Sequence, residues 1–179
     1  MTAIPYIMMR AVITAVWLAI RVWWWKKEGF RLRRELELLL VYICVIVVAR
    51  FTFLPFAKVD GKLQPLLFDP ALIFPPRINL VPLVHLLEYP EKREALINVI
   101  GNTAMFIPLG IVWPVVYKKL DRPRKVICAG VGVSLAVEVL QLPFFDRVSD
   151  IDDLLLNSLG FLLGYGIWLL ATRKKRKGQ

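Results

Sequence analysis

The sequence predicts an all-α membrane protein: a single domain of 179 residues that forms a bundle of about five transmembrane helices. Three observations predict this fold class. Hydrophobic residues make up 58% of the chain, more than a soluble domain of this length can cover. Five apolar stretches approach or exceed the roughly 20 residues that cross a hydrocarbon core. The basic residues between them lie in short blocks, as at the cytoplasmic ends of membrane helices.

Each apolar stretch is expected to be a helix, because a backbone in lipid must satisfy its own hydrogen bonds and none of the stretches alternates as a barrel strand does. In chain order they run from Ile4 to Trp25, from Leu38 to Phe56, from Ala95 to Tyr117, from Val126 to Phe145 and from Leu154 to Thr172. The first ends in three tryptophans instead of a small-residue cleavage site. We therefore expect it to be a retained span and not a signal peptide.

The distribution of basic residues predicts the orientation of the bundle. Five lie between the first and second stretches, five between the third and fourth, and five after the last, which is fifteen of the 24 in the chain. The opposite loops hold six basic residues against nine acidic ones. Because cytoplasmic loops are enriched in Lys and Arg, we expect the N-terminus outside and the C-terminus in the cytoplasm. This pattern also argues against nucleic acid as a partner, despite a net charge of +10.

The loop between the second and third stretches is long and rich in proline. Within it, residues 78–87 are apolar, but they are too few to span a membrane and are interrupted by Pro82. We expect this segment to be an interfacial or re-entrant element on the outer face.

Charged and amide side chains of the predicted helices lie at similar depth, toward the outer side. Such groups are costly in lipid and usually face the bundle interior or a wet cavity. Residues of one helix are three or four positions apart, so that they share a face. We therefore expect a polar cavity that opens outward. The group comprises Arg50, Asn98, Asn102, Glu138, Gln141, Asp150, Asp153 and Asn157, with Arg147 in the last outer loop.

Purely structural roles are the alternative for these residues. Hydrogen bonding between helices accounts for isolated amides. Helix capping and the helix dipole account for one or two of the acids that follow Ser149. Glu138 needs a partner, and Arg50 is the first candidate and Arg147 the second. Two further residues, Gly160 and Gly164, permit close helix packing.

Three groups of residues resemble the motifs of the VanZ-like membrane protein family. They are Arg50, Thr52 and Pro55 with Asn79-Leu80-Val81-Pro82; Asn98, Gly101-Asn102, Phe106, Pro108 and Gly110; and Ser134, Glu138, Gln141, Arg147, Asp150, Asp153, Asn157 and Gly160. The resemblance covers roughly residues 41–168. It implies a multi-pass protein of the bacterial plasma membrane. The founding member of that family is associated with resistance to teicoplanin, a glycopeptide antibiotic with a lipid tail.

Residues and resemblance together predict a protein that binds an amphiphile at the outer leaflet and is not an enzyme. The expected ligand is a membrane lipid, a lipid-linked cell-wall precursor or a teicoplanin-like lipoglycopeptide. The arginines would contact phosphate or carboxylate, and the acids would orient them or accept donors of the ligand. We expect no catalytic residue, metal ion or cofactor, and the sequence is compatible with a homo-oligomer. The expected ligand-binding residues are Arg50, Asn79, Asn98, Asn102, Glu138, Gln141, Arg147, Asp150, Asp153 and Asn157.

Two other functions remain as alternatives. In an intramembrane enzyme, Glu138 with Asp150 or Asp153 would supply a general acid and base. The sequence has no Ser-His or Cys-His arrangement, no histidine cluster and no phosphate-binding loop to support that alternative. The second alternative function is that of a transporter or a transporter subunit. Many transporters are built from inverted repeats, and the chain shows none.

Overall fold

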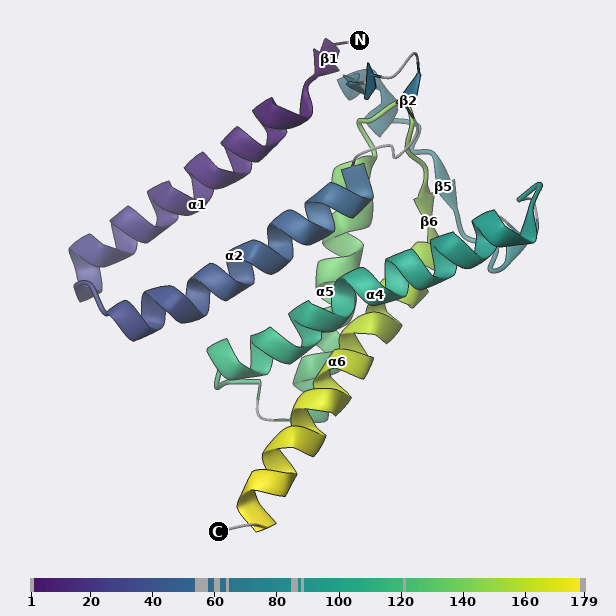
Figure 1. Cartoon of the computed structure of the whole chain (residues 1–179). Helices are drawn as coiled ribbons and strands as arrows, with labels where there is room; N and C mark the ends of the chain where they lie inside the picture. Colours follow the sequence, from purple (N-terminus) through teal and green to yellow (C-terminus); the bar gives the residue numbers. More distant parts are fainter. Residues whose placement is uncertain are drawn as a thin grey trace.

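Helices make up most of the computed structural model of the chain, which describes residues 2–53, 58–59, 62–63, 65–84, 87, 89–120 and 122–177. Each of the five apolar stretches overlaps a long helix, so the all-α fold class is confirmed (Figure 1). In chain order these helices are α1 (Tyr6–Glu28), α2 (Leu32–Phe53), α4 (Lys92–Val116), α5 (Pro123–Gln141) and α6 (Ile151–Lys177). Residues 54–56, which end the second predicted stretch and include Pro55 of the family resemblance, lie outside the described residues.

Among the described residues, four helices are long and apolar enough to cross a membrane: α1, α2, α4 and α6. The fifth expected span, α5, is not one of them. It has only 19 residues, and these include Arg124, Lys125 and Glu138. The prediction of helices that are long and apolar enough to cross a membrane is therefore confirmed for four of the five stretches.

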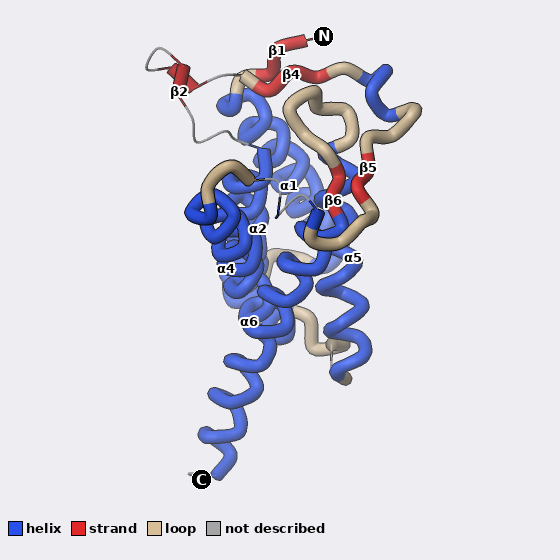
Figure 2. The backbone as a smooth tube through the Cα atoms, turned by 90° about the vertical axis from the view of Figure 1, so that its right-hand side faces the viewer, coloured by secondary structure: helices blue, strands red, loops and turns tan. Residues whose placement is uncertain are grey.

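Short strands of two or three residues lie at one end of the helices (Figure 2). The first, β1 (Thr2–Ile4), pairs antiparallel with β4 (Leu66–Phe68), and β2 (Lys58–Val59) pairs antiparallel with β3 (Lys62–Leu63). A 3-10 helix, η1 (Pro70–Ile73), follows β4. The last pair is parallel and joins β5 (Ile78–Asn79) to β6 (Ser149–Asp150). It fastens the proline-rich loop to the segment that leads into α6.

Packing is centred on α6, which lies against both α4 and α5, while α2 packs on the other side of α4 (Figure 1). The most buried apolar side chains come from three of these helices and include Phe106, Leu109, Val126 and Phe161. In contrast, α1 is the outermost helix and packs mainly against α2.

Three glycines bring α4 and α6 into direct backbone contact. A Cβ atom at Gly160 or Gly164 of α6 would overlap the backbone of α4, at Thr103 and Ile107 respectively. A Cβ atom at Gly110 of α4 would overlap the Phe161 backbone of α6. The close packing expected from Gly160 and Gly164 is confirmed, and it explains why small residues occur here.

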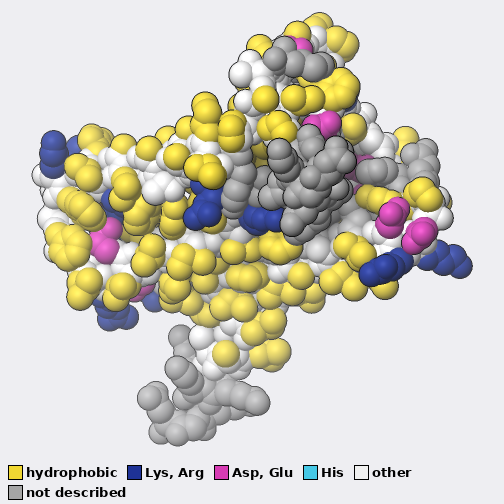
Figure 3. Space-filling model, turned by 45° about the horizontal axis from the view of Figure 1, so that its top comes forward, with side chains coloured by type: hydrophobic (Ala, Val, Ile, Leu, Met, Phe, Trp, Pro, Cys, Tyr) yellow, Lys and Arg dark blue, Asp and Glu magenta, His cyan; other side chains and the backbone are white. Residues whose placement is uncertain are grey.

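Most of the coloured surface in Figure 3 is hydrophobic, and charged side chains are sparse and gather mainly toward the two ends. Large apolar side chains point outward from the helices, for example Val16 of α1, Leu135 of α5 and Ile167 of α6. Apolar side chains in such numbers on the outside of a helical bundle fit a lipid environment.

The helices alternate in direction, so the bundle has two distinct ends. One end, which we call the strand end, contains the last turns of α2 and α5 and the first turns of α4 and α6. The other, which we call the basic end, contains the loops from α1 to α2 and from α4 to α5. There Arg34 Nη1 of α2 donates to the carbonyl oxygen of Val116 at the end of α4, over 2.7 Å.

Candidate functional site

A small polar cavity of about 110 Å³ lies at the strand end. It is enclosed by α2, α4, α6, the last residue of α5 and the loop from α5 to α6, and almost all of the accessible lining atoms are polar. Six of the ten residues expected at the ligand site line it. They are Asn98, Asn102, Gln141, Arg147, Asp153 and Asn157. The other lining residues are Phe51, Thr52 and Met105.

Helical periodicity places the polar groups of the cavity. On α4, Asn98 and Asn102 are four residues apart, and on α6 the same spacing separates Asp153 from Asn157. Residues at this spacing lie one above the other on one face of a helix. Because α4 and α6 are in backbone contact at their glycines, these two faces meet.

The amide of Asn102 joins the two helices. Its Nδ2 atom donates to Asp153 Oδ1 over 2.5 Å and to Asn98 Oδ1 over 3.2 Å. Asn98 Nδ2 in turn donates to the hydroxyl oxygen of Tyr89, over 3.1 Å. Burial, and then the negative charge of Asp153, raise the pKa of Tyr89, so its phenol is protonated at neutral pH. The result is a chain of hydrogen bonds along one wall of the cavity.

Arg147 supplies the positive charge of the cavity. Burial lowers the pKa of its guanidinium, while Asp146 and Asp153 act in the opposite direction. A guanidinium titrates so far above neutrality that Arg147 stays cationic. In the described part of the chain, its buried Nε has no hydrogen-bond partner, and neither has the buried Oδ1 of Asn157. The cavity wall thus offers both a charged donor and an acceptor to a ligand.

A second cluster of predicted site residues lies beside the cavity but does not line it. Glu138 is 4% exposed, and its Oε2 accepts a hydrogen bond of 3.1 Å from the backbone N–H of Asp150. Ser149 Oγ donates to the backbone oxygen of Glu138 over 2.7 Å. Asn79 Nδ2 donates to Asp150 Oδ2 over 3.2 Å. This cluster holds the end of α5 against the β5–β6 pair.

The predicted ion-pair partners of Glu138 are wrong. No ion pair with Arg50 or Arg147 is found for it within the ranges that the structure describes. The reason is that the chain turns back between α5 and α6, which brings a backbone amide of β6 to the carboxylate. Arg50 is half-buried in the last turn of α2 and does not line the cavity, although its neighbours Phe51 and Thr52 do.

The acidic run at the start of α6 serves two purposes. Asp150 Oδ1 accepts a hydrogen bond of 2.9 Å from the backbone N–H of Asp152, as a capping residue does. The capping role expected for one or two of the acids therefore holds for Asp150. Asp153, three residues later, faces the cavity instead.

A family model described as VanZ/LLP1 matches residues 39–172. The chain belongs to the VanZ/LLP1 family. This confirms the resemblance, and the matched range begins within α2 and contains every residue that lines the cavity. In this VanZ/LLP1 protein α1 lies outside the matched range. Searches of curated proteins and of solved structures give no match.

Two polar residues that shape this VanZ/LLP1 site, Asp152 and Tyr89, were not predicted from the sequence. The carboxylate oxygens of Asp152 accept hydrogen bonds of 3.0 and 2.9 Å from the backbone N–H of Leu83, which fastens the proline-rich loop to α6. The hydroxyl oxygen of Tyr89 accepts the last hydrogen bond of the series that runs through Asn102 and Asn98. The sequence suggested only a helix-capping role for Asp152, because it lies in a run of acids at a helix start. No spacing in the sequence links Tyr89 to Asn98. Among the described residues, no group of three or more His, Cys, Asp or Glu side chains is placed so that it could hold a metal ion.

Proposed function

We propose that this VanZ/LLP1 protein binds the charged head group of an amphiphile in the polar cavity, as a multi-pass protein of the bacterial plasma membrane. One observation carries the proposal: Arg147, Asp153 and four amides from separate elements line one small cavity at the end of an otherwise apolar bundle. Polar groups gathered in this way at membrane depth usually mark a substrate site.

The cavity faces the outer leaflet in this proposal. The basic loops and the basic C-terminal residues of α6 lie away from the strand end, and Lys and Arg favour the cytoplasmic side. The cytoplasm then lies at the basic end, the N-terminus is outside and the C-terminus is inside. This arrangement requires α5 to cross the membrane as a fifth span, from Pro123 at the basic end to Gln141 in the cavity wall.

The size of the cavity limits what it can hold. A volume of about 110 Å³ is well below the roughly 300–1,000 Å³ of sites that enclose drug-sized ligands. It suits a single polar group such as a phosphate, whose attached chain stays in the lipid. Arg147 and the amide N–H groups would donate to the phosphate oxygens, and Asp153 would accept a hydrogen bond from a hydroxyl group. A lipid-linked wall precursor or an anionic lipid fits this chemistry better than a whole lipoglycopeptide.

The proline-rich loop is proposed as an interfacial segment above the cavity. Leu80, Val81 and Leu83 are all more than half exposed, and they follow β5 at the strand end. Asp152 and the β5–β6 pair hold this apolar segment beside the start of α6. It would dip into the outer head-group region and guide a lipid to the cavity.

A binding role is proposed instead of catalysis because the two carboxylates of the enzymatic alternative are used differently. Asp153 lines the cavity, whereas Glu138 does not and accepts from the β6 backbone. A general acid and base must both reach the reacting group.

Binding is tested with purified full-length protein and two ligands that differ only in the head group, undecaprenyl phosphate and undecaprenol. Hydrogen bonds to a charged group contribute about 1.5–3 kcal/mol, so the phosphate should bind at least about ten-fold more tightly. Arg147→Gln should abolish this preference. Arg93→Gln is the matched control, since Arg93 is exposed at the same end and does not line the cavity. A preference that survives Arg147→Gln would contradict the proposal.

Teicoplanin resistance is proposed as a phenotype that follows from binding at the outer leaflet. A strain that carries the intact gene should tolerate more teicoplanin, with little change for vancomycin, and Arg147→Gln and Glu138→Ala should each lose this effect. Minimum inhibitory concentrations measure it, with protein levels checked by immunoblot. Equal susceptibility with and without the gene would contradict the resistance proposal. Head-group binding would still be tested by the comparison of undecaprenyl phosphate with undecaprenol.

A further inference from the structure

A second and larger hollow lies at the basic end, outside the site described above. It is a groove of about 570 Å³ between α1, α2 and Tyr117, the residue that follows α4. This volume is within the roughly 300–1,000 Å³ typical of small-molecule sites. Except for Val41 and Tyr117, its lining residues precede residue 39, so the groove lies mostly outside the VanZ/LLP1 match.

The two helices line the groove with regular faces. Trp17, Ile20 and Trp24 of α1 are three and four residues apart, and Leu38 and Val41 of α2 are three apart. Each set therefore lies on one side of its helix. These side chains are apolar or aromatic, so the inner part of the groove offers the surroundings that a hydrocarbon chain prefers.

Contacts hold α1 and α2 together along the groove without filling it. Thr14 Oγ1 and the hydroxyl oxygen of Tyr42 share a hydrogen bond of 2.7 Å, and the rings of Trp17 and Tyr42 are 4.8 Å apart. Nearer the loop, Arg21 makes two hydrogen bonds to Glu35, of 2.9 and 2.6 Å. The two helices are therefore fixed relative to each other, and the groove belongs to this arrangement.

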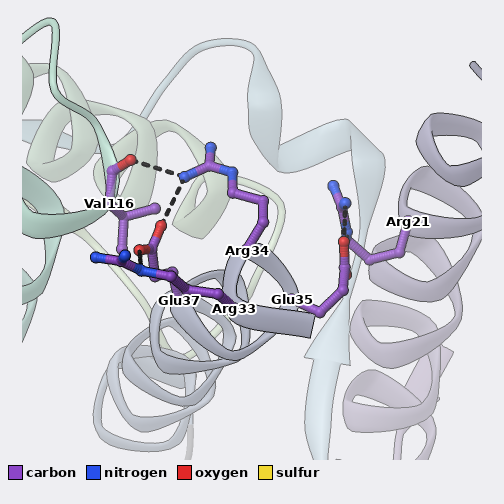
Figure 4. A network of polar contacts seen from close by, with 6 residues as sticks. All are labelled: Arg21, Arg33, Arg34, Glu35, Glu37 and Val116. Atoms are coloured by element: carbon purple, nitrogen blue, oxygen red, sulfur yellow. Dashed lines mark hydrogen bonds and ion pairs between the residues drawn. The ribbon is translucent and has the colours of Figure 1, made fainter. Parts of the chain in front are cut away.

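Positive charge remains at the mouth of the groove after the ion pairs are counted. The Arg21–Glu35 pair is neutral, and Arg34 extends away from it toward Glu37 and Val116 (Figure 4). Arg31 is an exposed lining residue, and the described residues form no ion pair with it. The charged side chains that line the groove are Arg21, Arg31 and Arg34 against Glu28 and Glu35, a net charge of +1.

The residues at the mouth also indicate membrane depth. Trp23, Trp24 and Trp25 end α1 together with Lys26 and Lys27, and Lys27 Nζ lies 3.8 Å from the centre of the Trp23 ring. Tryptophans and basic residues in this combination occur at the level of the lipid head groups. The mouth of the groove is then at head-group level, and its apolar inner part is at the level of the acyl chains.

We propose that this groove binds one anionic phospholipid of the leaflet at the basic end, with the phosphate at Arg31 and Arg34 and an acyl chain along Trp17, Ile20 and Leu38. Charge complementarity selects this occupant. A net positive mouth with hydrogen-bond donors favours an anionic head group over a zwitterionic one, and basic pockets between membrane helices bind anionic lipid head groups in general. The site is separate from the polar cavity and does not rest on the proposed function.

The head-group part is tested by native mass spectrometry of the full-length protein in detergent. Phosphatidylglycerol and phosphatidylcholine with identical acyl chains are titrated, and the affinity for the first bound lipid is measured. Arg31→Gln should weaken phosphatidylglycerol binding about five-fold, the effect of about 1 kcal/mol for one basic residue. It should weaken phosphatidylcholine binding less, because choline cancels the charge of that lipid's phosphate. Arg33→Gln is the matched control, because Arg33 does not line the groove and its side chain is 90% exposed. It should leave both affinities unchanged.

The acyl-chain part is tested with two substitutions of equal size on α2. Leu38→Trp fills the groove and should lower phosphatidylglycerol affinity at least about ten-fold. Leu40→Trp adds the same volume at an exposed position outside the groove and should have no effect. Thermal unfolding of each variant in the same detergent confirms that it is folded.

Three results would overturn the proposal. Equal affinity for the two lipids would show that charge does not select the occupant. Equal losses in Arg31→Gln and Arg33→Gln would indicate only general attraction to a basic surface. A change of oligomeric mass in Leu38→Trp with unaltered lipid binding would show that a second copy of the chain occupies the groove.

Discussion

At the scale of single residues, the amide of Asn102 links two walls of the candidate site. It donates to a carboxylate of α6 and to an amide of its own helix, so it fixes both side chains in the cavity wall. A hydrogen bond to a charged group contributes more than one between neutral groups, and a buried charge that loses a donor is costly. Replacing Asn102 is therefore expected to destabilise the protein more than replacing an exposed amide would.

We expect Asn102→Leu to lower the free energy of unfolding by about 1–3 kcal/mol, because the half-buried Asp153 carboxylate loses a donor. The double variant Asn102→Leu/Asp153→Leu should lose less than the two single variants together, since neither partner is then left behind. Reversible unfolding in mixed detergent micelles measures these values. Strictly additive losses would show that the two side chains do not interact in the folded protein.

At the scale of secondary structure elements, the approach of α4 and α6 organises the bundle. Lipid supplies no hydrophobic force between membrane helices, so close packing must hold them together. Gly160 and Gly164 let the α6 backbone touch that of α4, and Gly110 does the same from the other side. This contact also brings the polar faces of the two helices to the same cavity.

Gly160→Ala and Gly164→Ala should each destabilise the protein by about 1–3 kcal/mol, since the added methyl group meets backbone atoms that cannot rotate away. Gly166→Ala in the same helix is the control, because nothing lies within 4 Å of its Cβ position. It should be neutral or stabilising by up to about 1 kcal/mol, as alanine favours helix. Thermal unfolding in detergent tests this. Similar losses at Gly160 and Gly166 would mean that the close contact between α4 and α6 does not account for the effect, because helix propensity favours alanine at both positions.

At the scale of the whole molecule, the proposed topology requires α5 to cross the membrane. Its 19 residues are enough to span only if its charged residues lie at the ends or within the bundle. Arg124 and Lys125 begin the helix at the basic end, and Glu138 is buried near its other end. This placement supports the five-span topology of the proposed function.

Single cysteines introduced on either side of α5 should differ in their accessibility from outside intact cells. In a variant without Cys44 and Cys128, Asp146→Cys should react with a membrane-impermeant maleimide, and Lys118→Cys should react only after permeabilisation. Both positions are exposed. Lys92→Cys and Lys26→Cys extend the test to the other helices, the first accessible and the second protected. Equal labelling at positions 118 and 146 would mean that α5 does not cross.

Two features of this protein follow from local sequence alone: which parts of the chain are helices, and which helix faces are polar. The length of the apolar stretches predicts the helices, and the spacing of three and four residues predicts their polar faces. Asn98, Asn102, Asp153 and Asn157 could therefore be grouped before any fold was known. Both are local properties of the chain. Membership of the VanZ/LLP1 family was also predictable, because the resemblance rests on residue types and spacings that the sequence contains.

Which of these polar residues share a cavity, and which hold the fold together, depends on how the helices pack. Glu138 is paired with a β6 amide instead of an arginine because the α5–α6 turn and the β5–β6 pair bring that backbone to it. The groove between α1 and α2 depends likewise on the angle at which two apolar helices meet. Such contacts join residues far apart in the chain, and no periodicity within one helix encodes which neighbour it will face.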